Sequence, residues 1–385
     1  MLNLPFTVIM KSSSSSSSIS STSFVFPVAS MQNHSFFETA LTPLDVLDSI
    51  PDDIFRHCLL VYLTLQDISR LDQAMTNHKY RQCIIDKLSR SICIGDIQTV
   101  LTSNAFDWLR KRHICLVHMN IHPAMKPKHH RRAIESDLLV HLEVLRLKDS
   151  TINDTEVSGM WSLHTCPLLR TLELIECLSL TDWGIIRIIQ ANPSLQSLSI
   201  DDGSCISDSS VTAIAATLGK SLTTLSLSNC RKTYTITDTS LIVLAKSCHQ
   251  LQSLCLAYLS SLSDASVIAL AYHCTGLQVL DLSGNRTISD AAIVAVSEHC
   301  LAMHTLALGL CRNISDTSIT AISQRCLGLR SLNVTGNSRV TNVCIITMSK
   351  LSHHLRSLNV THCSLITSGA VGLLKNTLPT CHVKH

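Results

Sequence analysis

The chain reads LQVLDL at residues 277–282, and eight further strings of the same pattern lie before and after this one. The pattern is L-x-x-L-x-L, and its fourth position is leucine in all nine copies. Successive strings begin 26 to 29 residues apart, at Leu142, Leu169, Leu195, Leu222, Leu251, Leu277, Met303, Leu329 and Leu355. A nearly fixed period of this length is typical of stacked structural repeats, so the sequence predicts a solenoid.

Each repeat carries the signals of one short strand followed by one helix. In the string at 277–282, Leu280 and Leu282 alternate with other residues, which is the period of a strand with one buried face. A few residues later, segments such as ISD at 288–290 place Ser, Thr and Asp at a helix start, and apolar residues then recur three or four apart. We therefore predict an α/β fold, a leucine-rich-repeat horseshoe of about nine repeats with a parallel sheet inside and helices outside.

Two further positions of the repeat carry small side chains. Eight residues after the first leucine stands Cys or Asn in six copies, where an inward-turned side chain can bond backbone groups at the strand end. Ser150, Gly203 and Leu259 depart from this pattern. The predicted helices end near a second recurring small residue, and the members of this group are Cys166, Asn192, Cys248, Cys274, Cys300 and Cys326.

The 17 cysteines of the chain favour a reducing compartment. Neighbouring copies of one repeated position would stand at about the strand spacing, within the ~4.4–6.8 Å Cα separation that a disulfide accepts. Such ladders would cross-link in an oxidising environment, so we expect a cytoplasmic protein. The nucleus is a second candidate compartment, because KPKHHRR at 126–132 could be a nuclear address, although the same loop could be an anion contact or a solvated linker.

Composition disfavours nucleic-acid and membrane partners. The net charge is only +3 and charged residues make up 15% of the chain, and this charge balance does not indicate a nucleic-acid-binding protein. No apolar run approaches the ~20 residues that a membrane helix needs. The first ten residues have a short apolar stretch but lack the basic region of a secretory signal.

Motifs for catalysis or metal binding are missing from the sequence. No two cysteines stand in C-x-x-C spacing, and there is no Walker loop and no G-x-G-x-x-G. The group with the most metal-like composition lies at 113–130, but the spacing of His118 and His122 aligns ligands only on a helix, and a strand is predicted there. We therefore expect no catalytic residues, no cofactor, no bound metal and no enzyme activity.

A segment before the repeats has a different character. IPDDIF at 50–55 begins a helix, because Pro suits a first helical position and Asp suits the positive end of the helix dipole. A Tyr-Leu pair at 62–63 and QDISRL at 66–71 follow. Their order and spacing resemble those of an F-box, and the repeats resemble the cysteine-containing leucine-rich repeats that often accompany one. The third helix departs from the family pattern, since NHKY stands at 77–80 where many members have Cys and Trp.

The resemblance implies a substrate receptor of an SCF-type ubiquitin ligase. It implies that the head docks on a Skp-type adaptor of a cullin complex, while the repeats hold a target protein for ubiquitin-dependent degradation. The family's adaptor contacts carry over to Pro51, Ile54, Leu63, Ile68 and Leu71. These side chains could instead form only the core of the head's own helices. The chain would then be a leucine-rich-repeat interaction scaffold with no link to a ligase.

We divide the chain into four segments. Residues 1–40 are a disordered Ser-rich tail, 41–90 the F-box-like helical module, 91–137 a connector with an N-terminal capping layer, and 138–385 the leucine-rich-repeat domain. Within the connector, alternation over 114–121 predicts a strand that covers the end of the sheet.

The predicted target surface is the concave face of the sheet and the rim beside it. Its candidate residues are Tyr258, Asp281, Asn333, Arg231, Arg286, Arg312 and Arg339. Three of the arginines follow the turn residue directly, and Arg339 lies one position further. Stacked side by side, they could bind carboxylates or phosphate on a target, or they could be solvated turn residues.

Overall fold

The computed structural model describes residues 117–121, 141–148, 152–161, 166–202, 206–230 and 236–385, together with Gln82. All of them belong to one compact unit, Leu47–His385. The predicted Ser-rich tail and, apart from Gln82, the F-box-like module lie outside the described residues. The same is true of the predicted adaptor contacts Pro51, Ile54, Leu63, Ile68 and Leu71.

The described strands form one parallel sheet of 11 strands, in which spatial order follows sequence order. Equivalent residues pair across neighbouring strands, with Leu254 opposite Leu280 and Leu280 opposite Leu306. The strands are β1 (His118–Ile121), β2 (Val144–Lys148), β3 (Thr171–Ile175), β4 (Ser197–Asp201), β5 (Thr224–Ser226), β6 (Ser253–Cys255), β7 (Val279–Asp281), β8 (Thr305–Ala307), β9 (Ser331–Asn333), β10 (Ser357–Asn359) and β11 (His382–Lys384).

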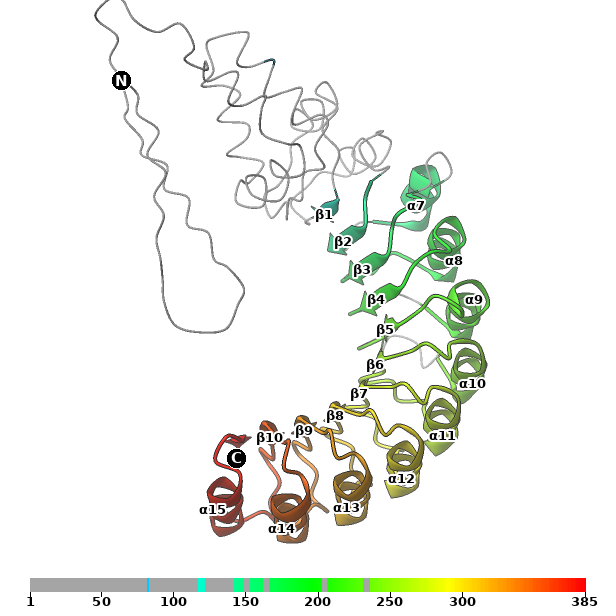
Figure 1. Ribbon diagram of the computed structural model, residues 1–385. Coiled ribbons are helices and arrows are strands. Elements are labelled where there is room, and N and C mark those ends of the chain that lie inside the picture. The colour runs from blue at the N-terminus through cyan, green and yellow to red at the C-terminus, as the bar shows by residue number, and fades with distance from the viewer. Residues whose placement is uncertain are drawn as a thin grey trace, which may run out of the picture. The chain divides into compact units, whose positions relative to one another are not determined.

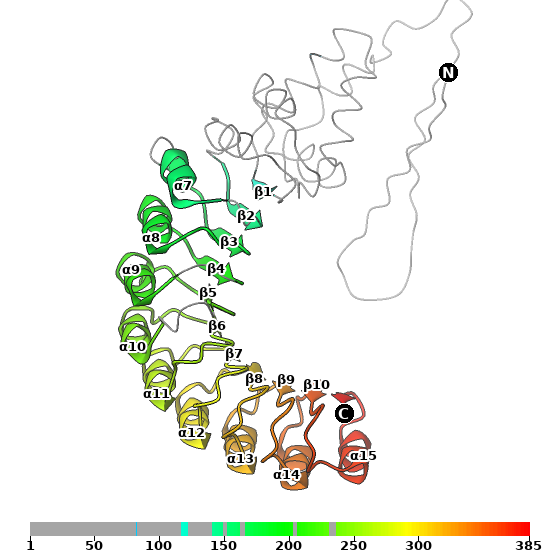
Figure 2. The ribbon, with the colours of Figure 1, turned by 180° about the vertical axis from the view of Figure 1, so that it is seen from behind.

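Helices alternate with the strands and cover the outer, convex side of the sheet, so the strands line the inner curve (Figure 1, Figure 2). They are α7 (Asp154–Trp161), α8 (Asp182–Ala191), α9 (Asp208–Leu218), α10 (Asp238–Ser247), α11 (Asp264–His273), α12 (Asp290–His299), α13 (Asp316–Arg325), α14 (Asn342–Leu351) and α15 (Ser368–Thr377). The predicted α/β leucine-rich-repeat solenoid is confirmed. None of the helices that the structure describes is both long and apolar enough to cross a membrane.

The leucines of the repeated pattern form the core between sheet and helices. The nine side chains at its fourth position, from Leu145 to Leu358, are each 0–1% exposed. Replacing one of them with alanine would remove buried apolar contacts and leave a cavity, at a cost of about 2–5 kcal/mol. The period of the sequence pattern therefore sets the positions of strands β2 to β10.

The strands differ in extent from the simple repeat pattern. Strands β5–β10 cover three residues each, and backbone hydrogen bonds continue past their ends, such as Gly284 N to Gly309 O at 2.7 Å. Two strands lie outside the nine leucine strings. One is β1, within the stretch predicted as a strand, and the other is β11, which sequence reasoning missed because HVK lacks the leucine pattern.

Aspartates at the helix starts join each repeat to the next one. The predicted Ser or Thr caps are observed, for example Ser289 Oγ accepting from Ala291 N at 3.3 Å. The following Asp, expected to cap the same helix, instead accepts from the cap residue of the next repeat, with N–H to Oδ1 distances of 2.7–2.9 Å. The pairs are Asp154–Thr181, Asp182–Ser207, Asp208–Thr237, Asp238–Ser263, Asp264–Ser289, Asp290–Ser315 and Asp316–Thr341.

Candidate partner-binding surface

The concave floor over β6–β9 is made of small, weakly polar side chains. Ala257, Ser283 and Gly309 are buried, and the flanking Asp281 and Asn333 are half-buried. Both of these candidate residues bond their own strand: Asp281 Oδ1 accepts from Ser283 N at 2.8 Å, and Asn333 Oδ1 accepts from Thr335 N at 3.1 Å and from Thr335 Oγ1 at 2.6 Å. Their remaining polar atoms are held in fixed positions on a floor that a partner backbone can approach closely.

The floor over β2–β4 is charged instead. Arg146 pairs with Glu173 at 2.8 Å and Lys148 pairs with Glu176 at 3.4 Å. Asp201 accepts from Ser226 Oγ at 2.6 Å and from Ser228 N at 3.2 Å. These residues were not among the sequence candidates, although the alternation that identified Asp281 also places Arg146, Lys148, Glu173 and Asp201 on the concave face.

A column of left-handed residues follows the strands at the rim of the sheet. In eight of the nine repeats the structure describes the same position, and it has positive φ, between 55° and 78°, in Glu176, Asp202, Asn229, Tyr258, Gly284, Leu310, Gly336 and His362. Sequence reasoning identified only Tyr258 in this column. The recurrence of Gly284 and Gly336 at one repeat position is the signal that could have revealed it, since glycine adopts this conformation without a Cβ penalty.

Side chains at the turn position bond backbone groups at the strand end, as the sequence predicts, and the acceptors belong to the preceding repeat. Asn285 Nδ2 donates to Leu256 O at 2.8 Å and Asn337 Nδ2 donates to Leu308 O at 2.8 Å. The Cys311 thiol donates to Leu282 O at 3.1 Å, and the Cys363 thiol makes the same bond to Val334 O at 3.1 Å. These bonds fix the backbone from which the rim arginines project.

The structure brings together two of the four rim arginines. Arg286 and Arg312 are exposed and occupy equivalent positions in adjacent repeats, directly after Asn285 and Cys311. Arg339 is also exposed, but its position in the repeat is that of Asn313. Ser315 forms an isolated parallel β-bridge with Arg339, and Ser289 forms the same β-bridge with Asn313. Arg231 lies outside the described residues. The rim therefore carries Arg286 and Arg312 at equivalent positions of adjacent repeats, with Arg339 offset by one position.

The helix-end cysteines form a stack of free thiols. Cys248, Cys274, Cys300 and Cys326 follow their helices directly, and each donates its backbone N–H to the carbonyl four residues before it. The Cys274 thiol lies 3.3 Å from Cys248 O in the preceding repeat. Burial raises the pKa of Cys274 to about 11 and that of Cys300 to about 12, which keeps these thiols protonated. They act as small packing groups.

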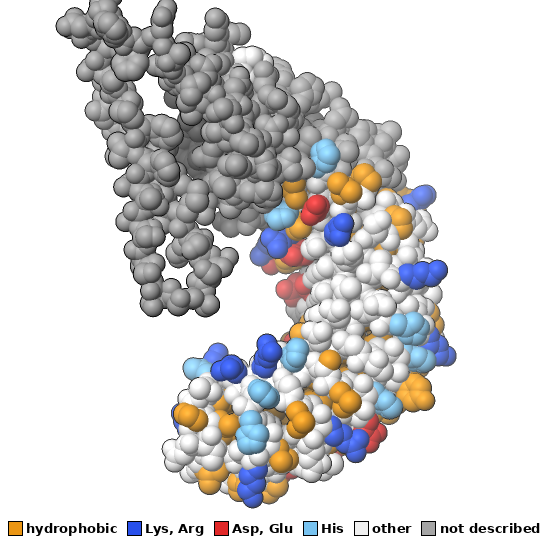
Figure 3. All heavy atoms as spheres, viewed as in Figure 1, with side chains coloured by type: hydrophobic (Ala, Val, Ile, Leu, Met, Phe, Trp, Pro, Cys, Tyr) orange, Lys and Arg blue, Asp and Glu red, His pale blue; other side chains and the backbone are white. Residues whose placement is uncertain are grey.

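Histidines and aromatic groups gather where the helices end. The Tyr272 ring lies 5.0 Å from that of His299 and 5.8 Å from that of His273, and the His249 and His273 rings are 6.1 Å apart. A helix C-terminus favours such residues because its backbone carbonyls carry partial negative charge. In the face drawn in Figure 3, His, Lys and Arg side chains predominate over acidic ones on the C-terminal repeats.

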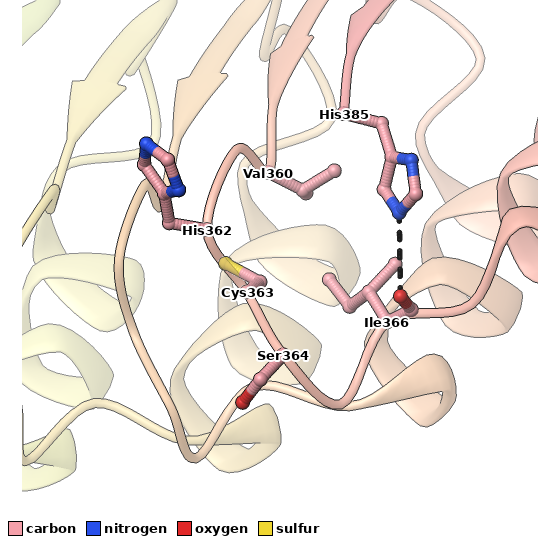
Figure 4. A pocket seen from close by; sticks show the side chains of 6 residues that line it. All are labelled: Val360, His362, Cys363, Ser364, Ile366 and His385. Carbon is pink, nitrogen blue, oxygen red and sulfur yellow. Dashed lines mark hydrogen bonds between the residues drawn. The ribbon is translucent and has the colours of Figure 1, made fainter.

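A shallow pocket lies at the C-terminal end of the repeats. Its volume is about 530 Å³, and it is lined by Val360, His362, Cys363, Ser364, Ile366 and His385 (Figure 4). His385 Nε2 lies 3.3 Å from Ile366 O. In the view of Figure 4, His362 and His385 lie on opposite sides of Cys363. Within the described residues, no group of three or more His, Cys, Asp or Glu is arranged to hold a metal ion.

Comparison with known proteins identifies the repeats. A family model described as Leucine Rich repeat matches residues 273–297 and 351–374, each of which contains one strand and most of the following helix. No curated protein matches the chain. Among solved structures, the Rad7 and Elc1 complex in yeast is similar with a TM-score of 0.45, 14% identity and coverage of 83% of this chain and 98% of that chain. An internalin from Listeria monocytogenes is similar with a TM-score of 0.47, 18% identity and coverage of 74% and 76%.

Proposed function

We propose that the chain is the non-catalytic substrate-recognition subunit of an SCF-type E3 ubiquitin ligase. Its F-box-like head would dock on a Skp-type adaptor of a cullin complex through Pro51, Ile54, Leu63, Ile68 and Leu71, and its repeats would hold the target protein. One observation carries the proposal: an F-box-like sequence at 50–71 and a leucine-rich-repeat sheet with a small-residue concave floor occur in the same chain.

The chemistry of the described surface supports binding. The floor over β6–β9 offers close backbone approach, and the rim offers Arg286 and Arg312 for charged groups. Burial raises the pKa of the Cys311 thiol to about 12, so this thiol, which directly precedes Arg312 in the sequence, is protonated at neutral pH. A partner covering a few repeats would bury about 800 Å² on each side, the size of a standard stable interface.

Co-purification of the full-length chain with a Skp-type adaptor tests this function. We expect a complex at micromolar concentration, and we expect the double variant Pro51→Ala with Leu63→Asp to abolish it. The matched control is Arg286→Glu with Arg312→Glu, which should bind the adaptor as well as the wild type does. Circular dichroism of both variants should match that of the wild type, since the core of the repeats is untouched.

A folded wild-type chain that fails to bind the adaptor would remove the ligase proposal. The chain would then be an interaction scaffold, whose repeats retain the same concave face. The target-binding half of the proposal is tested by capture of a target from lysate. Capture should survive loss of adaptor binding and fall in the arginine double variant.

A further inference from the structure

Bulky residues and glycines alternate along one part of the left-handed column. Over four consecutive repeats the column holds Tyr258, Gly284, Leu310 and Gly336, all with positive φ. Glycine tolerates this conformation, whereas a leucine or a tyrosine pays a steric cost for it. The chain therefore places two large side chains where the backbone disfavours them.

The glycines make room for their bulky neighbours. A Cβ added to Gly284 would lie 2.2 Å from Cδ1 of Tyr258, and one added to Gly336 would lie 2.6 Å from Cδ2 of Leu310. Each large side chain thus lies over the glycine of the following repeat. Burial does not account for the arrangement, because Leu310 remains 44% exposed and Tyr258 is only half-buried. The Leu310 side chain is therefore exposed to solvent, and the Tyr258 ring is partly exposed.

Positively charged residues follow the column closely in the sequence. Arg286 and Arg312 each stand two residues after a column position, and neither forms an ion pair with an acid of the described residues. The aspartates of the same repeats already accept hydrogen bonds: Asp281 from Ser283, Asp290 from Ser315, and Asp316 from Thr341. A partner with carboxylates would complement this rim, and a basic partner would be repelled by it.

We infer that the rim formed by Tyr258, Leu310, Arg286 and Arg312, which we call the Tyr–Leu rim, binds an extended acidic peptide segment of the target. An aliphatic or aromatic side chain of that segment packs on Tyr258 and Leu310, and two carboxylates pair with Arg286 and Arg312. The inference rests on the part of the proposed function in which the repeats hold a target, and it is independent of adaptor docking.

The spacing of the rim defines the peptide further. Equivalent atoms of adjacent repeats lie about 4.8 Å apart at the sheet, and an extended chain advances about 6.6 Å over two residues. Acidic residues two apart in the sequence point to the same side of an extended segment and can therefore reach the two arginines together. Exposed apolar groups beside few cations favour a peptide over a nucleic acid, whose phosphates would leave Leu310 without a contact.

A random peptide library displayed on phage and selected on the full-length chain tests the inference. Enriched peptides should carry two acidic residues next to one large apolar residue. Titration of one enriched peptide should show binding weakened about tenfold or more in Arg286→Glu with Arg312→Glu and in Leu310→Gly. Leu310→Gly suits the left-handed backbone, so loss of folding would not explain its effect.

His362→Gly is the matched control, because it makes the same backbone exchange in the same column outside the rim. It should bind the peptide as the wild type does. Failure to enrich any peptide, enrichment without acidic residues, or equal losses in Leu310→Gly and His362→Gly would overturn the inference. All of these variants should keep adaptor binding, so loss of the rim and loss of the ligase function give different results.

Discussion

The carboxylate of Asp290 accepts two hydrogen bonds from Ser315 of the next repeat, from the backbone N–H at 2.8 Å and from the hydroxyl at 2.5 Å. Asp290 is the first residue of α12, and Ser315 is the N-cap of α13. This pair of hydrogen bonds joins the N-cap residue of α13 to a side chain from the start of α12. The same connection recurs from Asp154 to Asp316, and Asn342 continues it by accepting from Thr367 N at 2.9 Å.

Replacing Asp290 with alanine should lower the free energy of unfolding by about 2–3 kcal/mol, because the Ser315 N–H and hydroxyl and the Ser318 hydroxyl all lose their acceptor. Urea unfolding followed by circular dichroism measures the change. Glu298→Ala is the control, since it removes only an exposed ion pair with Arg325, worth about 0–1 kcal/mol. Equal losses in the two variants would contradict a special role for the carboxylate of Asp290.

Acid should weaken the repeats through these carboxylates. Burial alone would raise the pKa of Asp290, but hydrogen bonds from Ser315 and Ser318 together lower it below its ordinary value, and the pKa of Asp182 is lowered in the same way by Ser207 and Ser210. A carboxyl with a lowered folded-state pKa contributes stability above its unfolded-state pKa, and this contribution disappears as the pH falls through the folded-state value.

The urea midpoint should therefore fall as the pH drops below the ordinary aspartate value of 3.8. The variant Asp182→Asn with Asp238→Asn and Asp290→Asn should be less stable at neutral pH and should show a weaker dependence on pH in this acid range. If the urea midpoint of this variant falls as steeply with pH as that of the wild type, other carboxylates cause the loss of stability in acid.

Alanine should have opposite effects at two glycines. Gly284→Ala forces a Cβ into the ring of Tyr258 at φ +78°, so it should destabilise the chain by about 1–3 kcal/mol. In α15, a Cβ at Gly372 would meet nothing within 4 Å, so Gly372→Ala should stabilise the chain by about 0.5–1 kcal/mol. Thermal unfolding measures both. Adding Tyr258→Gly should recover part of the loss in Gly284→Ala, and no recovery would mean that the ring is not the obstacle.

The stacked thiols should resist alkylation in the folded chain. Burial, with a smaller contribution from Cys274, raises the pKa of Cys248 to about 12, and the thiolate is the reactive form. With iodoacetamide at pH 8, mass spectrometry of peptides should find Cys248, Cys274, Cys300 and Cys326 unmodified until urea is added. Rapid labelling of Cys300 in the folded chain would contradict its 0% exposure.

The repeat architecture could be predicted from the leucine strings because each string encodes a buried strand face. The caps could be placed as well, since Ser289 and its equivalents accept a local N–H. The partner of Asp290 could not be predicted, because a carboxylate at a helix start suits its own helix equally well on local grounds. The contact with Ser315 depends on how closely two repeats stack, which is a tertiary property.

The candidate surface was only partly predictable for a related reason. The alternation placed Asp281 and Asn333 on the concave face, but not their bonds back to Ser283 and Thr335. The sequence already placed Arg339 one position further than the other arginines, and the β-bridge between Ser315 and Arg339 confirms that it belongs to a different row. Leu310 drew no attention because an isolated leucine after a strand carries no signal until its backbone conformation is known.

Neighbour-supplied carboxylates also govern how the solenoid would yield to mechanical force. When the repeat that carries the aspartate is pulled away, the N-cap residue of the next repeat along the chain loses its hydrogen-bond acceptor. The helix of that next repeat then becomes easier to unwind. Coupling of this kind makes adjacent repeats rupture as blocks. A single-molecule pulling trace should therefore show a few large steps, each releasing the length of several repeats.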